Sequence, residues 1–280
     1  MSELEALLLG IVQGLTEFLP ISSSGHLIIV PWLQDYTFLL ENPDFNQTFD
    51  VALHAGTLFG AIAYFRREVV ELTRGFTEVV RRRAIATTPQ RISVAIAVGT
   101  IPAVIVGGLG ADFIADHLGE PWMIAIQLIA FGALLLHADR LPQRKGLEGS
   151  SIRDGLYIGI AQVLALAPGT SRSGITITAG RYLGLDRDGA ARFSFLLLIP
   201  IVFGATVFEA MGALREGLPD GVAGPMVVGT IAAAISGYLA IAFLLRLVRT
   251  ASYRSFVYYR YAAGVIILLV IATGLRPPTF

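Results

Sequence analysis

A stretch from Gln13 to His26 places a carboxylate, an imidazole and three serine hydroxyl groups within largely apolar sequence. Glu17 lies near its middle, and the hydroxyl groups belong to consecutive serines, Ser22, Ser23 and Ser24. A serine with a base in hydrogen-bonding reach is the minimum requirement for nucleophilic catalysis. We therefore expect a serine nucleophile, with His26 two to four residues away as its hydrogen-bonding partner. A helix cap is the alternative use of such a serine-rich turn.

A second stretch, from Pro168 to Thr176, carries Arg172 in the middle of another apolar segment. An ionised arginine at the centre of a membrane helix costs about 2.5 kcal/mol or more, so it needs a partner or an anionic ligand. Its planar guanidinium can bind phosphate oxygens through two parallel hydrogen bonds. Arg172 is therefore expected to bind an anion, and an internal ion pair with Glu17 is the alternative.

Glu17 places a negative charge within an apolar segment, so it also needs a partner or a ligand. Three functions are open to it. It can pair with Arg172, act as a general base, or bind a divalent cation beside phosphate charges that would otherwise repel it. His54, in the next apolar segment, either faces the same cavity or is satisfied by packing. These residues predict an anion-binding site with hydrolytic groups, but they do not identify the substrate.

The composition indicates a membrane protein. Hydrophobic residues make up 54% of the 280 residues and charged residues only 15%, a balance typical of polytopic membrane proteins. The net charge is zero, which gives no support for nucleic-acid binding, and cysteine is absent, which excludes thiolate chemistry. Helices are the expected spanning elements, because a lipid-exposed backbone must satisfy its own hydrogen bonds. The apolar segments are 4–30, 49–65, 92–111, 122–137, 155–180, 193–213, 225–247 and 257–275.

The first and fifth segments contain the two polar stretches and are interrupted by Pro20 and by Pro168–Gly169. Irregular backbone at membrane depth is tolerated only against protein or a water-filled cavity, so the two breaks should meet. The serines after each break can cap a new helix, whose free N–H groups favour an anion. We expect two re-entrant helical hairpins that meet at the active site, together with about six transmembrane helices.

The two halves of the chain resemble each other. The broken segments align without a gap at an offset of 149, which pairs Gly10 with Gly159 and Ser22 with Ser171. Further blocks repeat at offsets of 144 and 130, the last pairing Gly99 with Gly229. Blocks repeated in the same order indicate duplication of a four-segment unit. We therefore predict one membrane domain, 1–280, built of two inverted repeats at about 1–145 and 150–280.

The distribution of Arg and Lys predicts the orientation. With the two hairpins re-entrant, the regions 66–91, 138–154, 181–192 and 246–260 fall on one side of the membrane. These regions carry all but three of the 21 basic residues, and the positive-inside rule makes that side cytoplasmic. Both termini are then expected outside. The three remaining basic residues are Arg172, Arg215 and Arg276.

The two motifs closely resemble the signatures of the bacterial undecaprenyl-diphosphatase (UppP/BacA) family. They read QGLTEFLPISSSGH from Gln13 and PGTSRSGIT from Pro168, and the run FDVALH from Phe49 adds to the resemblance. The resemblance extends over the whole chain in length and segment order. It implies hydrolysis of undecaprenyl diphosphate in the bacterial inner membrane, at a site open to the periplasm. The product would be the lipid carrier of peptidoglycan synthesis, and the activity would confer bacitracin resistance.

The resemblance also implies roles for individual residues. Glu17, Ser23, His26 and Arg172 match the catalytic positions, with Ser23 as the proposed nucleophile and Glu17 as a ligand of a divalent cation, Mg²⁺ or Ca²⁺. The position of Gln13 is Glu or Gln in the family, so Gln here weakens the case for two carboxylates on one metal. The expected substrate-binding residues are Gln13, Ser22, Ser24, Ser171, Ser173 and Thr176.

A transporter or lipid flippase is the alternative function, because inverted repeats with broken helices are common in secondary transporters. The cluster of hydroxyl, imidazole, guanidinium and carboxylate groups favours hydrolysis, since translocation does not require it. Small residues such as Gly60, Gly107, Gly204 and Gly237 permit close helix packing within one chain or between two. The membrane lipid is an expected partner, and a homodimer is left open.

Overall fold

A computed structural model describes residues 1–280 except 35, 37, 40–41, 217–220 and 280, without side chains at 43–44, 111–116, 209 and 212–216. The side chain of Arg215 therefore lies outside the described residues. The described chain is helical, apart from an isolated bridge between Lys145 and Leu185. The helices are α1 (Glu3–Phe18), α2 (Ser23–Gln34), α4 (Pro43–Tyr64), α5 (Arg66–Arg82), α6 (Thr88–Leu118), α7 (Pro121–Asp139), α8 (Ile152–Gln162), α9 (Arg172–Tyr182), α10 (Arg187–Glu216), α11 (Ala223–Leu247) and α12 (Arg254–Ala272). Short 3-10 turns, η1 (Leu147–Gly149) and η2 (Val163–Leu166), precede and follow α8.

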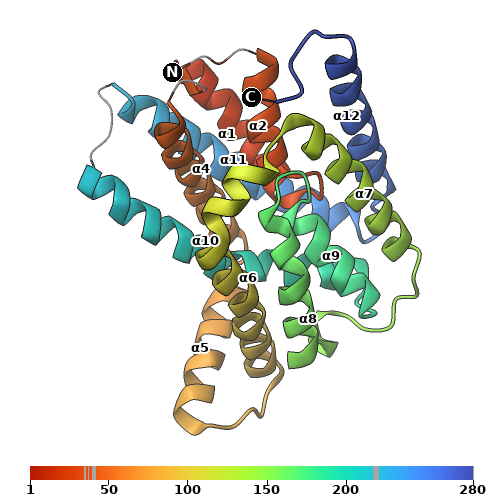
Figure 1. Cartoon of the computed structure of the whole chain (residues 1–280). Coiled ribbons are helices and arrows are strands. Elements are labelled where there is room, and N and C mark those ends of the chain that lie inside the picture. The colour runs from red at the N-terminus through yellow and green to blue at the C-terminus, as the bar shows by residue number, and fades with distance from the viewer. Residues whose placement is uncertain (35, 37, 40–41, 217–220, 280) are drawn as a thin grey trace.

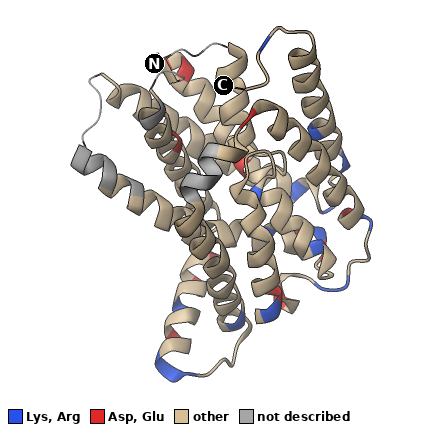
Figure 2. Cartoon of the chain, viewed as in Figure 1, with Lys and Arg blue, Asp and Glu red and all other residues tan. Residues whose placement is uncertain are grey.

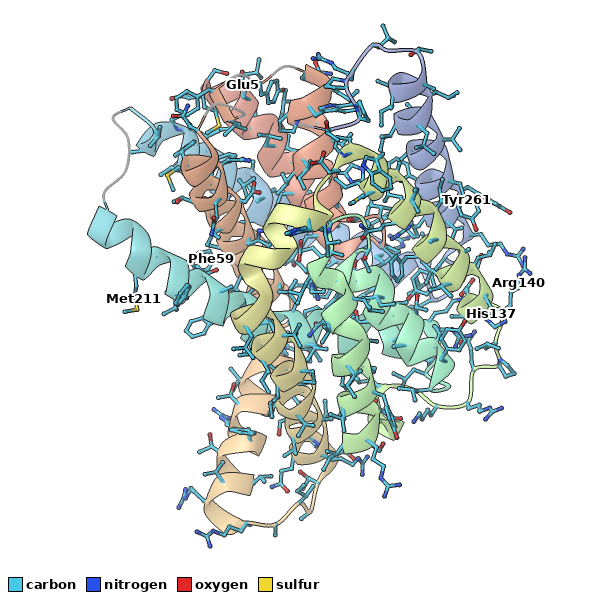
Figure 3. The ribbon with its side chains drawn as sticks, viewed as in Figure 1. Glu5, Phe59, His137, Arg140, Met211 and Tyr261 are labelled. Atoms are coloured by element: carbon cyan, nitrogen blue, oxygen red, sulfur yellow. The ribbon has the colours of Figure 1, made fainter. Side chains whose placement is uncertain are left out.

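Five described helical segments are long and apolar enough to cross a membrane, and a sixth is reached if the bent pair α4 and α5 is one span. This agrees with a polytopic all-α membrane protein. Large apolar side chains such as Phe59 and Met211 are more than half exposed (Figure 3), as expected of a surface that faces lipid. The five segments are Thr88–Gly110, Pro121–Asp139, Arg187–Phe208, Ala223–Leu247 and Arg254–Ala272.

The region after α4 is helical, although it lies between two of the predicted apolar segments. The chain bends by 88° at Phe65 and continues as α5. This helix is amphipathic: Val69 and Leu72 pack against the core, while most of its arginines are exposed. The many arginines keep 66–91 out of the predicted apolar segments, but amphipathic spacing is compatible with a helix at a membrane boundary.

Both predicted breaks are present. The first segment is divided between α1 and α2 by residues 19–22, and the second between α8 and α9 by η2 and the turn that follows it. Figure 1 shows the two breaks side by side near the centre of the molecule, and hydrogen bonds connect them. The prediction that two interrupted segments meet inside the protein is thus confirmed.

Packing between the halves is reciprocal. The first helix of each half lies against a long helix of the other: α1 packs on α11, and α8 packs on α6. Both contacts are very close at glycine. A Cβ atom on Gly10 would lie 2.3 Å from the carbonyl oxygen of Gly229, and one on Gly159 would lie 2.2 Å from that of Gly99. These are the glycines that the sequence comparison paired.

The other small residues differ in their surroundings. A Cβ atom on Gly60 would lie 2.6 Å from the carbonyl oxygen of Ala234, and one on Gly237 would lie 2.9 Å from the ring of Phe18. Gly107 and Gly204 have more room, and a Cβ atom on Gly204 would meet nothing within 4 Å among the described atoms. Close packing within the chain therefore explains Gly60 and Gly237 but not Gly204.

The charges follow the predicted asymmetry. The two termini lie at one end of the molecule, and most Lys and Arg residues lie on segments away from that end (Figure 2). Arg260 is an exception. The charge distribution predicts it on the cytoplasmic side with the rest of 246–260, but its side chain, on α12, is fully buried. An arginine inside an apolar helix needs acceptors within the protein.

Candidate active site

The first break positions the serine-rich turn by an unusual backbone conformation. Ser22 has φ 79°, in the left-handed region that non-glycine residues seldom occupy. Its Oγ accepts a hydrogen bond of 3.3 Å from the amide of Gly25, so it caps the start of α2. This conformation ends α1 and turns the chain so that Ser23 is the first residue of α2.

The second break repeats this local structure. Ser171 has φ 73°, and its Oγ accepts a hydrogen bond of 3.1 Å from the amide of Gly174. Arg172 is the first residue of α9. The repeat pairs Ser22 with Ser171, and both side chains cap the helix that follows them.

Hydrogen bonds join the two breaks directly. The amide of Gly169 donates to Ser22 Oγ at 3.1 Å, and Ser173 Oγ donates to the carbonyl oxygen of Leu19 at 3.1 Å. Ser171 Oγ and Ser173 Oγ lie 3.3 Å apart. The buried polar groups of the two irregular segments thus form hydrogen bonds with one another.

Glu17 is the centre of the site, and its side chain is 4% exposed. Its Oε2 accepts a hydrogen bond of 2.5 Å from Ser23 Oγ and one of 3.2 Å from Gln13 Nε2. Its Oε1 accepts from Arg172 Nη2 at 3.2 Å and from Nε at 3.4 Å. The predicted nucleophile, carboxylate and guanidinium therefore lie in one cluster, and a carboxylate bonded to a hydroxyl is placed to take its proton.

Arg172 is held on two sides. Besides Glu17, its Nη1 donates to the carbonyl oxygen of Ser194 at 3.1 Å. Thr176 supports this contact, because its Oγ1 donates a 2.7 Å hydrogen bond to the carbonyl oxygen of Arg172 and lies 2.7 Å from Ser194 Oγ. The ion pair with Glu17 is present, and 14% of the arginine side chain remains exposed. A paired but accessible guanidinium can also meet an oxyanion.

His26 does not bond to Ser23, so the expected serine–histidine hydrogen bond is wrong. Its Nδ1 lies 2.6 Å from the carbonyl oxygen of Ser22, and its Nε2 lies 2.7 Å from the hydroxyl of Tyr259. A carbonyl can only accept, so Nδ1 carries a proton and Nε2 accepts from Tyr259 in the neutral ring. The hydroxyl of Ser23 turns instead to Glu17. Ser24, beside it in the first turn of α2, is half-buried.

Arg260 was not identified from the sequence as part of the site. Its Nη1 donates to the carbonyl oxygen of Pro20 at 3.2 Å, and its Nη2 donates to those of Gly169 at 3.0 Å and Thr170 at 3.1 Å. It also bonds to the carbonyl oxygens of Gln127 and Leu128 on α7. One guanidinium therefore fastens both breaks to each other. The signal in the sequence was an arginine inside the apolar segment 257–275.

The residues allow a divalent cation but do not form a complete protein cage. Among the described residues, no group of three or more His, Cys, Asp and Glu side chains is placed to hold a metal ion. Glu17 is the carboxylate of the cluster, and the buried Gln13 Oε1 has no hydrogen-bond partner in the described part of the chain. Mg²⁺ is commonly held by one or two carboxylates together with phosphate oxygens of the substrate. The donor set fits a cation shared with a phosphate ligand.

Comparison with known proteins gives consistent results. A family model described as bacitracin resistance protein BacA matches residues 6–266. A protein of Pelobacter propionicus named undecaprenyl-diphosphatase is 43% identical over 277 residues, which cover 98% of this chain and 99% of that protein. Proteins of the same name from Geobacter sulfurreducens, 46% identical over 266 residues, and Thermomicrobium roseum, 43% identical over 278 residues, cover 94% and 96% of this chain and 96% and 98% of their own.

Proposed function

This chain belongs to the bacitracin resistance protein BacA family, and we propose that it hydrolyses undecaprenyl diphosphate to undecaprenyl phosphate and inorganic phosphate. The relatives that match nearly the whole chain are named undecaprenyl-diphosphatase. One observation within the molecule carries the chemistry: Ser23 Oγ donates a 2.5 Å hydrogen bond to Glu17, whose other oxygen binds Arg172. This cluster joins a nucleophile, a proton acceptor and an anion-binding group.

In the proposed reaction, Ser23 attacks the terminal phosphorus of the diphosphate. As the Oγ–P bond forms, the hydroxyl proton moves to Glu17, and the bond from phosphorus to the bridging oxygen breaks. Undecaprenyl phosphate leaves, and water then hydrolyses the phosphoserine to release inorganic phosphate. Direct attack by water, activated by Glu17 while Ser23 binds phosphate, is the alternative route.

Arg172 and the starts of α2 and α9 are proposed to hold the diphosphate. Both helices begin at the junction of the breaks, where their N–H groups and positive dipole ends favour an anion. Arg172 already has one N–H group on Ser194, which fixes its plane before a ligand arrives. Ser24 and Gln13 are proposed to contact the substrate, whereas Ser22, Ser171, Ser173 and Thr176 are engaged in holding the two breaks and Arg172.

A divalent cation, Mg²⁺ or Ca²⁺, is proposed as a cofactor that Glu17 and Gln13 would help to hold. When bound, it would offset the negative charge of the diphosphate. His26 is proposed to act at the edge of the site, because its ring nitrogens are bonded to Ser22 and Tyr259 rather than to the nucleophile.

The protein is a multi-pass membrane protein, and we place it in the bacterial inner membrane with the site open to the periplasm and both termini outside. The position of most Lys and Arg on segments away from the two termini supports this orientation (Figure 2). The proposed inverted repeats are supported by the reciprocal glycine contacts of α1 with α11 and α8 with α6, and by the equivalent caps Ser22 and Ser171.

The test is release of inorganic phosphate from undecaprenyl diphosphate by the purified protein in detergent. Glu17→Ala and Arg172→Ala should abolish release, whereas His137→Gln should not, since His137 bonds to Tyr182 at the surface away from the breaks (Figure 3). A wild-type protein that moves the lipid between leaflets of a vesicle but releases no phosphate would support the flippase alternative.

A further inference from the structure

The helix α5 presents exposed apolar side chains next to a row of arginines. Phe76 and Val80 are 42% and 61% exposed, although Val69 and Leu72 of the same helix pack against the core. Three exposed arginines repeat every seven residues, so they lie along one line of the helix. This basic row consists of Arg67, Arg74 and Arg81. A helix with exposed apolar and basic faces is typical of a segment that lies at the membrane surface.

The protein does not neutralise the charge of the basic row. Arginines outnumber glutamates on α5. Glu68 pairs with Arg192 of α10 at 3.4 Å, and Glu78 accepts a 2.8 Å hydrogen bond from Gln90 Nε2. The three arginines of the basic row form no ion pair with any residue that the structure describes. Their charge is therefore available to an anion from outside the chain.

A cavity on the basic side of α5 can hold such an anion. Arg66, Arg67 and Arg74 line this cavity of about 600 Å³ between α5 and the start of α6. The apolar segment of α6 that is long enough to cross the membrane begins at Thr88, beside the cavity. The cavity therefore lies at the depth where lipid headgroups meet the spanning helix, on the side that the basic residues predict to be cytoplasmic (Figure 2).

An apolar groove of about 350 Å³ lies between α5, α6 and α10. Its side chains include Val69 and Phe76 of α5, Ile96 of α6, and Ile199 and Phe203 of α10. Since α6 and α10 are both candidate spans, the groove faces the hydrocarbon of the membrane. Ile96 lies eight residues after Thr88, which is about 12 Å along the helix. The order of arginines, then groove, matches the order of headgroup, then acyl chain, in a phospholipid.

We propose that α5, the cavity and the groove form a binding site for an anionic phospholipid of the cytoplasmic leaflet. The phosphate group lies among the arginines, and an acyl chain occupies the groove. Guanidinium groups form strong, charge-assisted hydrogen bonds with phosphate oxygens, and basic residues near the membrane surface attract anionic lipids. A zwitterionic lipid offers the same chains without a net charge, so the site distinguishes the two. The inference is independent of the proposed hydrolysis, because α5 contributes no residue to the candidate active site.

The experiment titrates the full-length protein in detergent with phosphatidylglycerol or phosphatidylcholine of identical acyl chains, and native mass spectrometry counts the bound lipids. Phosphatidylglycerol should bind at least about tenfold more tightly, since each arginine near a membrane surface contributes about fivefold. The double variant Arg67→Gln/Arg74→Gln should lose this preference. The matched control Arg144→Gln/Arg153→Gln removes the same charge from exposed positions on the same side and should keep it.

A second variant tests the groove. Ala97 lines it on α6, so Ala97→Phe should fill it and weaken the binding of phosphatidylglycerol severalfold. Unchanged binding in this variant would overturn the assignment of the groove to an acyl chain. A thermal unfolding scan without added lipid identifies any variant that fails to fold, and Ala97→Leu then replaces Ala97→Phe.

Three results would overturn the lipid site as a whole. The first is equal affinity of the wild-type protein for the two lipids, and the second is an equal loss of preference in the control double variant. The third is a stable dimer in the spectra that excludes lipid, because it would show that a second copy of the chain covers this face. Displacement of the lipid by inorganic phosphate at the same concentration would also contradict it, since the site would then take free phosphate.

Discussion

Ser23 Oγ lies 2.5 Å from Glu17 Oε2, although the end of α1 and a reversal of the chain separate the two residues. Ser22 makes this contact possible, because its left-handed backbone ends one helical direction and starts the next. The carboxylate, rather than the neighbouring histidine, is thus the group bonded to the predicted nucleophile. This relationship determines how the site can be tested.

Replacing Ser23 by Ala should lower phosphate release by more than about a thousandfold, because the residual rate comes from binding groups alone. Glu17→Gln should lower it by about 10²- to 10⁴-fold, the usual contribution of a general base. The wild-type protein should form a phosphoserine at Ser23 that can be trapped by acid quenching and located by mass spectrometry. Near-normal turnover in Ser23→Ala would instead support direct attack by water.

The Arg172–Glu17 pair should show strong coupling in a double-mutant cycle. Removing one partner of a buried ion pair leaves an uncompensated charge and costs about 3–5 kcal/mol, whereas removing both is far less harmful. We expect Arg172→Met and Glu17→Gln each to lower the unfolding temperature, and the double variant to recover much of the loss. The exposed pair Arg249–Asp188 is the control, and its coupling should not exceed about 1 kcal/mol. Additive losses at the buried pair would contradict the assigned contact.

Arg260→Met should destabilise the protein and abolish activity, since five backbone carbonyl groups at and beside the two breaks lose their donor. Each buried acceptor left unpaired costs about 1–3 kcal/mol. Arg260→Lys should rescue little, because an ammonium group cannot reproduce the guanidinium fork. Thermal unfolding and phosphate release provide the readouts. Arg254→Met, an exposed position on the same helix, should be close to wild type; equal effects at both positions would refute a special role for Arg260.

Gly10→Ala and Gly159→Ala should both destabilise the protein, because the added methyl group would meet a backbone carbonyl that cannot move independently of its helix. Gly204→Ala is the matched control. It lies within α10 with free space around it, and alanine favours a helix over glycine by up to about 1 kcal/mol. Unfolding temperatures of the three variants compare the sites. Similar values for all three would show that the two close contacts are not rigid.

Asp154 should make stability sensitive to acid at the Lys145 end of the molecule. Burial alone would raise the pKa of this carboxyl, but hydrogen bonds from Lys145 and Ser151 lower it below its ordinary value of 3.8. A lowered native pKa stabilises the fold above pH 3.8, and this contribution is lost as the pH falls through the lowered value. Asp154→Asn should therefore be less stable than wild type at pH 7, and the difference in unfolding temperature should shrink toward pH 3. A constant difference would contradict the linkage.

The sequence alone determined the membrane class, the two interrupted segments, their meeting and the residue types of the site. These follow from local properties: apolar length sets the spans, and proline, glycine and serine clusters set the breaks. A charged residue within such a segment also indicates an internal partner, as Arg172 and Glu17 proved to have. The same rule applies to Arg260, which also has internal partners. Because Arg260 lies close to the basic residues of a predicted membrane boundary, the sequence does not distinguish it from them.

Only the tertiary structure decided which groups bond to which. The spacing along the chain placed His26 closest to Ser23, yet the reversal at Ser22 directs the serine to Glu17 and leaves the imidazole to Tyr259. The approach of α4 and α12 brings His54 and Arg260 to the breaks from segments distant in sequence. Such contacts depend on the rotation of each helix about its axis, which the packing of the whole bundle determines and no local pattern records.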